Sequence, residues 1–240
     1  MKTIQHSILL IVVLFTIACS NTQEYDVIVY GGTPSGVIAS VAAAREGSSV
    51  LLVEQTRHLG GMNTSGINTA ESEHMITAAI TGVAEEFYIR LGEKYTPEFF
   101  QEFGQSRDLN FQPGDPAYFF ESHVAEEVFN EMIAQENVKV LFQKYVESVQ
   151  KKNGDIQTIT FTDGSAASGS IFIDCTYEGD LMARAGVSYT YGRESQSQYE
   201  EQYAGIRFMD DTLQARTVTT SGELMAYFTK PNGLVHRSRR

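Results

Sequence analysis

Residues 25–54 read YDVIVYGGTPSGVIASVAAAREGSSVLLVE, and this stretch decides the fold of the chain. A short apolar run at 27–30 enters a glycine-rich turn at 31–36, and a run of small residues with helical character follows. A second apolar run at 50–53 then ends at Glu54. The pattern predicts a strand, a tight turn, a helix and a parallel strand, which is the opening unit of a doubly wound sheet.

The same unit predicts a dinucleotide site. Gly31 permits the tight turn, Gly36 lets the helix pack close to the strand, and the helix N-terminus offers N–H groups to a pyrophosphate. Glu54 lies 18 residues after Gly36, where an acid can accept hydrogen bonds from a ribose hydroxyl. Thr33 replaces the second glycine of G-x-G-x-x-G, so a side chain is present at the approach to the pyrophosphate. The alternative is an ordinary strand–turn–helix of another α/β protein.

Composition narrows the function classes. The 240 residues include 18 basic and 30 acidic side chains, a net charge of −12, which disfavours nucleic acid as a partner. Hydrophobic residues at 42% and aromatic residues at 11% indicate a folded globular protein. Only two cysteines occur, Cys19 and Cys175. We therefore expect no internal disulfide in the mature protein and no iron–sulfur cluster held by this chain alone, and no metal site is predicted.

Residues 1–19 have the pattern of a targeting segment. Lys2 supplies a positive start, residues 8–18 form an apolar run too short to span a bilayer, and Cys19 follows Ala18. This order resembles a bacterial lipoprotein signal, and it predicts an exported, periplasmic or cell-surface protein anchored to a membrane through lipidated Cys19. The alternative is an ordinary secretory signal cut near Ala18, which would leave a soluble secreted protein.

The rest of the chain predicts further helices and strands around the opening unit. In order, the patterns indicate an amphipathic helix at 76–91, an irregular insertion near 93–120, a helix with Ser122 as N-cap, a strand at 138–142, a hairpin at 146–150 and 156–162 around Asn153-Gly154-Asp155, and a strand at 170–175. From Arg193 onward the chain is polar and these signals fade. The order predicts a doubly wound, Rossmann-like α/β sheet with an antiparallel β-meander.

Three motifs, DVIVYGGTPSGVIAS, VEQTRHLGGM and FIDCTYEGDLMARAGV, together resemble the FAD-dependent oxidoreductases of the glutathione-reductase-type superfamily. The GGTPSG turn is similar to that of secreted bacterial FAD-dependent oxidoreductases labelled xanthan lyase-like, a subgroup that also resembles the flavin-binding part of heterodisulfide reductase. The resemblance covers about residues 25–205. It implies that residues 20–192 form an FAD-binding Rossmann-like domain and that 193–240 begin a substrate or cap region.

The resemblance also implies contacts with FAD at the turns that end the strands. These are Gly31, Ser35 and Gly36 at the pyrophosphate, Glu54 at the adenosine ribose, Gly60, Gly61 and Met62 between pyrophosphate and flavin, Val146 near the adenine, and Thr176, Gly179 and Asp180 in a second strand-end loop. The glycine pair favours FAD over NAD, because a simple NAD dehydrogenase has no need for it.

Two alternatives to an FAD-dependent oxidoreductase remain open. The first is an NAD(P)-dependent Rossmann oxidoreductase, since both cofactors share an ADP half. The second is a truncated, non-catalytic flavoprotein fragment. Nothing after Arg193 matches the late strand and glycine–aspartate loop with which such flavoproteins close the site, so we expect an N-terminal fragment that binds FAD weakly when made alone.

No catalytic residue is assigned from the sequence, and the small-molecule substrate is unknown. Flavin chemistry is carried by the cofactor, so no nucleophile is required. The titratable residues nearest the motifs are His58, Glu71, His74, His123 and Cys175. A loop histidine is more often solvated or structural, and a lone cysteine at a strand end is usually a small buried hydrophobe.

Overall fold

The computed structural model describes residues 24–66, 79–104, 110–190, 196–200, 227–229 and 235–237. Cys19, Glu71 and His74 lie outside the described residues. The chain divides into two compact units after Val187, and each is described by itself. Within the described part of the chain, every helix is too short or too polar to cross a membrane.

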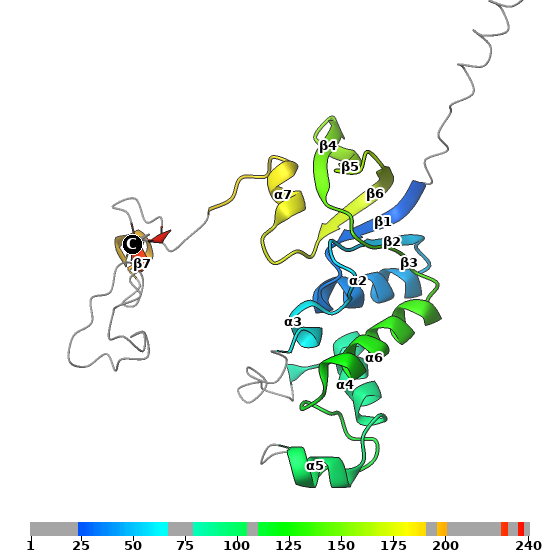
Figure 1. The fold of residues 1–240 in the computed structure, drawn as a ribbon. Coiled ribbons are helices and arrows are strands. Elements are labelled where there is room, and N and C mark those ends of the chain that lie inside the picture. The colour runs from blue at the N-terminus through cyan, green and yellow to red at the C-terminus, as the bar shows by residue number, and fades with distance from the viewer. Residues whose placement is uncertain are drawn as a thin grey trace, which may run out of the picture. The chain divides into compact units, whose positions relative to one another are not determined.

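The first unit is built on a six-stranded sheet. Its strands are β1 (Glu24–Tyr30), β2 (Val50–Val53), β3 (Lys139–Leu141), β4 (Val146–Lys152), β5 (Asp155–Phe161) and β6 (Ala166–Asp174), in the spatial order β3-β2-β1-β6-β5-β4. Strands β3, β2, β1 and β6 are parallel, whereas β4, β5 and β6 pair antiparallel. The predicted α/β sheet with a late antiparallel meander is confirmed (Figure 1).

Strand β6 is shared between the parallel and antiparallel parts of the sheet. Its first half pairs with β5, where Ser168 lies opposite Thr158. Its second half runs parallel to β1 up to Asp174, which lies beside Tyr30. Because β1 and β6 are parallel and Tyr30 lies beside Asp174, the ends of the two strands lie together, and the Cys175 N–H donates to the Tyr30 carbonyl at 2.8 Å.

Alternate residues of β1 face two different cores. Val27 and Val29 pack with the helices, whereas Ile28 and Tyr30 pack against the meander residues Ile159 and Phe161 and others. This division follows from the two-residue period of a strand. Both faces of the parallel strands are therefore covered, which explains why β1 and β2 are almost continuously apolar.

Helix α2 packs against one face of the parallel strands, and α4 and α6 pack against α2 farther from the sheet (Figure 1). The helices of the first unit are α2 (Pro34–Arg45), α3 (Gly61–Thr64), α4 (Gly82–Gly92), α5 (Pro97–Phe103), α6 (Ser122–Gln135) and α7 (Asp180–Arg184). Phe87 of α4 stacks on Phe129 of α6 with ring centroids 4.1 Å apart. At the surface, Arg45 of α2 pairs with both Glu86 and Glu136 and so ties the three helices together.

Three sequence expectations need correction. Helix α4 begins at Gly82 rather than at 76, because Gly82 has φ +65° and a right-handed helix cannot continue back through it. Ser122 is the first helical residue of α6, and Glu121 occupies the N-cap position. The insertion near 93–120 contains a short helix, α5, which starts at Pro97 and buries Phe100.

The second unit contains short elements only among its described residues. Helix α8 spans Gln196–Tyr199, and β7 (Tyr227–Thr229) pairs antiparallel with β8 (Val235–Arg237) in a sheet of its own. The polar composition after Arg193 did not predict this pair of strands. The division after Val187 lies five residues before the predicted boundary at 192.

Candidate cofactor cleft

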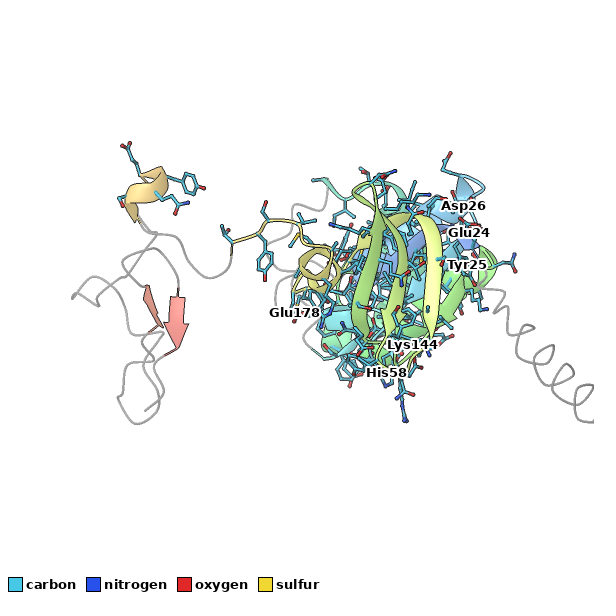
Figure 2. The ribbon with its side chains drawn as sticks, turned by 90° about the horizontal axis from the view of Figure 1, so that it is seen from above. Glu24, Tyr25, Asp26, His58, Lys144 and Glu178 are labelled. Atoms are coloured by element: carbon cyan, nitrogen blue, oxygen red, sulfur yellow. The ribbon has the colours of Figure 1, made fainter. Side chains whose placement is uncertain are left out.

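A cleft of about 600 Å³ opens where the loops after β1, β2 and β6 meet α3 and the start of α6. It is lined by Gly31, Thr33, Glu54, Gln55, Thr56, His58, Gly61, Met62, Thr64, Ser65, Ser122, His123, Glu126, Thr176, Tyr177 and Glu178. Figure 2 labels His58 at the opposite end of the sheet from Glu24 and Asp26, which begin β1. The carboxyl ends of parallel strands are where ligands bind in open α/β sheets.

The glycines of the first turn are required by close backbone contacts. Gly31 has φ +105°, and a Cβ there would lie 2.7 Å from the carbonyl carbon of Cys175. A Cβ on Gly36 would overlap the carbonyl oxygen of Gly31. The predicted steric roles of both glycines, a tight turn and a closely packed helix, are therefore present in the structure.

Thr33 shows how a side chain fits in place of the second glycine. Its Oγ1 donates to the Cys175 carbonyl at 2.8 Å and accepts from the Gly36 N–H at 3.3 Å, so it caps α2. The residue is only 6% exposed. Ser35, which is exposed, has its Oγ 2.9 Å from Thr33 Oγ1. The additional side chain is thus held by the protein.

Two backbone donors of this turn remain uncommitted. The Gly31 N–H donates to the Val53 carbonyl, and the Gly32 N–H donates to Glu54. Pro34 has no N–H to offer. Among the described residues, none accepts a hydrogen bond from the N–H of Thr33 or Ser35. These two donors are the ones the turn can present to a phosphate.

Glu54 is a buried acid, 7% exposed, at the end of β2. Its Oε2 accepts from the Gly32 N–H at 2.5 Å, and its Oε1 accepts from the Thr56 N–H at 2.6 Å. Two N–H groups therefore fix the carboxylate. A carboxylate has about four lone-pair positions, so each oxygen keeps capacity for a ligand hydroxyl.

The second glycine turn joins the first through its backbone. The Gly60 N–H donates to the Gly32 carbonyl at 2.7 Å. Gly60 has φ +95°, and a Cβ there would lie 2.6 Å from the ring of Phe129 on α6. The glycine pair is thus pressed between the first turn and the helical layer.

Tyr177 covers the other glycine of the pair. The Met62 N–H donates to the Tyr177 hydroxyl at 2.8 Å, and a Cβ on Gly61 would overlap that hydroxyl. Tyr177 lies in the loop after β6 and is 54% exposed. The loops after β2 and β6 therefore touch at one side of the cleft.

Asp174 shapes the loop after β6. Its Oδ1 accepts from both the N–H and the hydroxyl of Thr176, and its Oδ2 accepts from the Met182 N–H at 2.8 Å. The Thr176 Oγ1 in turn accepts from the Asp180 N–H at 2.9 Å, and Gly179 adopts φ +71°. These bonds hold Thr176 at the cleft.

The structure brings some of the predicted contact residues to the cleft and leaves others behind it. Those that line it are Gly31, Glu54, Gly61, Met62 and Thr176, while Ser35, Gly36, Gly60, Gly179 and Asp180 belong to the adjoining turns but not to the lining. Val146 is 2% exposed, and its N–H donates to the Tyr30 hydroxyl at 2.9 Å. The adenine contact at Val146 stays a prediction.

Several lining residues were missed by sequence reasoning. Gln55 directly follows Glu54, and Tyr177 lies between Thr176 and Gly179. Their proximity to these predicted residues was the signal that could have identified them. Glu126 gave no signal, because it reaches His58 from α6, with its Oε1 2.9 Å from His58 Nδ1.

Among the residues that the structure describes, the titratable candidates show no nucleophile at the cleft. Burial raises the pKa of the Cys175 thiol, which is opposite to the lowered pKa of a reactive cysteine. His58 has a side chain that is 71% exposed and is held by Glu126. Among the described residues, no group of three or more His, Cys, Asp or Glu side chains could hold a metal ion.

A family model described as FAD dependent oxidoreductase matches residues 26–237. The chain belongs to this family. FAD is accordingly the cofactor of this chain, in agreement with the resemblance seen in the three motifs. The match spans both compact units.

Known proteins match parts of this chain, which spans less than two thirds of the length of the first two. The NADH:fumarate oxidoreductase of Klebsiella pneumoniae (strain 342) is 36% identical over 69 residues, which are 28% of this chain and 8% of that protein. The L-proline dehydrogenase of P. horikoshii aligns with TM-score 0.44 and 15% identity over 72% of this chain and 59% of its own. Thermovibrio ammonificans THI4 aligns with TM-score 0.43 and 18% identity over 78% and 71%.

Proposed function

We propose that the cleft binds the ADP half of FAD and that the protein is an FAD-dependent oxidoreductase acting on a small-molecule substrate. The observation that carries the proposal is the Glu54 carboxylate. It is buried at the end of β2 and fixed by two N–H groups, and it lines the cleft between the two glycine turns. An acid in this place accepts hydrogen bonds from ribose hydroxyls.

The residues present fit the ADP half of FAD. The uncommitted N–H groups of Thr33 and Ser35 suit a phosphate, and the Glu54 oxygens suit a ribose. The cleft volume of about 600 Å³ is in the range of small-molecule sites. A 2′-phosphate, as in NADP, would meet the Glu54 carboxylate and be repelled. The donor set therefore favours FAD or NAD over NADP, and family membership favours FAD.

The chain's own contribution is binding and orientation. Bound FAD supplies the electron transfer between substrate and acceptor. Glu54 holds the ribose, the first turn holds the phosphates, and the contact between Tyr177 and Met62 limits the cleft on one side. No side chain of the described part is assigned a proton-transfer role.

Absorbance and titration test the proposal. The purified protein is titrated with FAD, NADH or NADPH, and bound FAD is recognised by its absorbance near 450 nm, on the order of the oxidised flavin band. We expect FAD to bind more tightly than NADH, though weakly to this chain made alone, and NADPH to bind least because its 2′-phosphate meets Glu54. Tighter binding of a nicotinamide cofactor than of FAD would favour the NAD(P)-dependent alternative, and protein that binds no FAD would favour a non-catalytic flavoprotein fragment.

We further propose that the protein is an exported lipoprotein held at a bacterial membrane through Cys19, with no nucleic-acid partner. The apolar run at 8–18 before Cys19 supports the anchor, and the net charge of −12 disfavours nucleic acid. Cell fractionation of wild type and Cys19→Ser tests the anchor. Wild type should partition with membranes and the variant should not. Wild type found wholly soluble and cut between Ala18 and Cys19 would support an ordinary secretory signal.

We also propose membership of the subgroup labelled xanthan lyase-like, supported by the GGTPSG turn. The label does not imply lyase activity, because a lyase needs a base beside a uronic acid and the motifs here indicate a flavin site. An assay for unsaturated uronic acid released from xanthan checks this. We expect none, and release by the purified protein would contradict it.

A further inference from the structure

Gln55 lies at the centre of a hydrogen-bond network behind the cleft. It follows Glu54 at the end of β2, is partly buried and lines the cleft. Its Nε2 donates to the Tyr30 hydroxyl at 2.9 Å and to Asp180 Oδ2 at 2.9 Å. The network therefore joins the ends of β1 and β2 to the start of α7.

Both partners of the Gln55 amide nitrogen are acceptors. The Asp180 carboxylate oxygens accept hydrogen bonds, and Oδ1 lies 3.4 Å from Arg184 Nη1. The Tyr30 hydroxyl donates its single proton to the Lys144 carbonyl at 3.4 Å, while its oxygen accepts from the Val146 N–H. Burial raises the pKa of Tyr30, so this proton is retained.

These partners fix the orientation of the Gln55 carboxamide. A flipped amide would place Oε1 against the Asp180 carboxylate, where two acceptors repel, and would strip both amide protons of partners. The observed orientation uses both protons and turns Oε1 away from Asp180. Of the residues that the structure describes, none donates to Oε1. Every buried side-chain oxygen of the described part has a hydrogen-bond partner. Because Oε1 has none, it is not buried and is accessible to solvent.

We propose that Gln55 is a ligand-binding residue of the cleft, whose Oε1 accepts a hydrogen bond from a donor on the adenosine part of the cofactor. Tyr30 and Asp180 are the positioning residues that fix its carboxamide. The inference rests on the proposed function, since it assumes that the ADP half of FAD occupies this cleft. The adenosine part carries two kinds of hydrogen-bond donor, the ribose hydroxyls and the adenine amine. Either could donate to Oε1 of Gln55, which lies next to Glu54 in the sequence.

Titrations with matched nucleotides test the contact and separate the two donors. The probes are ADP, inosine diphosphate, which lacks the adenine amine, and 2′-deoxy- and 3′-deoxy-ADP. They are titrated against wild type, Gln55→Leu and the control Gln157→Leu, which removes an exposed glutamine of β5 outside the cleft lining. We expect Gln55→Leu to weaken ADP binding by about three- to tenfold and Gln157→Leu to leave it unchanged.

The pattern across probes decides the proposal. One analogue, the one without the contacted donor, should bind wild type and Gln55→Leu equally well. If every probe loses the same factor on Gln55→Leu, or none loses any, Oε1 makes no such contact and the inference is wrong. If wild type binds neither ADP nor FAD, the proposed function itself fails, which is a separate outcome.

A second variant keeps the inference testable if Gln55→Leu does not fold. Asp180→Asn is isosteric and leaves Gln55 in place, but it allows the carboxamide to flip because an amide can both donate and accept. We expect ADP affinity to fall by about two- to threefold and discrimination among the four probes to shrink. Unchanged affinity and discrimination would overturn the positioning role of Asp180.

Discussion

The two glycine turns of the cleft differ in what presses against their glycines. At the first turn, added Cβ atoms on Gly31 and Gly36 would meet backbone atoms of Cys175 and Gly31. At the second turn, a Cβ on Gly61 would meet the phenol of Tyr177, a side chain that is 54% exposed. Backbone at a sheet end cannot move without moving a strand, whereas an exposed side chain can rotate. The first turn is therefore rigid, whereas the second can adjust at Gly61 but not at Gly60, where an added Cβ would meet the buried ring of Phe129.

The substitution Gly36→Ala should have the largest effect on stability. Its Cβ would overlap the Gly31 carbonyl oxygen, so β1 and α2 must separate. We expect a loss of about 3 kcal/mol or more in the free energy of unfolding, measured by urea denaturation. Gly47→Ala is the control, because Gly47 has φ +91° but nothing within 4 Å. It should cost about 1–2 kcal/mol from backbone strain alone. Equal losses would show that the first turn is not rigid.

The substitution Glu54→Gln probes the hydrogen bonds that tie the first turn to the end of β2. An amide NH₂ at this position would face the N–H of Gly32 or Thr56, and one of the two hydrogen bonds would be lost. We expect the free energy of unfolding to fall by about 1–3 kcal/mol, again by urea denaturation. A variant as stable as wild type would show that the carboxylate does not hold the first turn.

The adjustability of the second turn can be tested with a double-mutant cycle. Gly61→Ala should cost about 1–2 kcal/mol, because φ is +47° and the Cβ displaces Tyr177. In a Tyr177→Ala background the displacement disappears, so the cost should be smaller by about 0.5–1 kcal/mol. Strictly additive losses in thermal or urea unfolding would mean that Tyr177 does not press on this turn.

An acid titration examines the helical layer that supports both turns. Hydrogen bonds from Arg45 lower the pKa of Glu86 from 4.5 to about 2. A lowered folded-state pKa stabilises the protein above pH 4.5, and this contribution is lost as the pH falls toward 2. Because the pair is partly exposed, we expect Glu86→Gln to remove only about 1 kcal/mol of the acid dependence. An unchanged pH profile of unfolding would contradict the pairing.

Local patterns predicted the parts of the cleft that are near in sequence. The glycine turn at 31–36 and Glu54 follow one another within a single strand–helix–strand unit, and their period and spacing identify them. The meander was likewise visible from Asn153-Gly154, whose residues have φ +56° and +97°. The first residues of the helices were less predictable. The positive φ of Gly82 determines where α4 begins and the extended backbone of Glu121 determines where α6 begins, and neither conformation follows from the hydrophobic pattern.

Contacts between distant segments could not be predicted from the chain. Glu126 meets His58 across 68 residues, and Tyr177 meets Met62 across 115, so neither pair leaves a local pattern. The role of Thr33 depended on a carbonyl group 142 residues away at Cys175. The orientation of the Gln55 carboxamide depends on Tyr30 of β1 and Asp180 of α7, which lie 25 and 125 residues away in the sequence.

The most direct test of the account is calorimetric titration of FAD into the purified protein, with ADP as competitor. We predict that FAD binds, that ADP displaces it from the same cleft, and that Glu54→Gln weakens both by about tenfold or more. Glu46→Gln, a change of an exposed acid at the end of α2, should leave both affinities unchanged. FAD binding that ADP does not compete with, or that Glu54→Gln leaves intact, would contradict the assignment of this cleft to the ADP half of FAD.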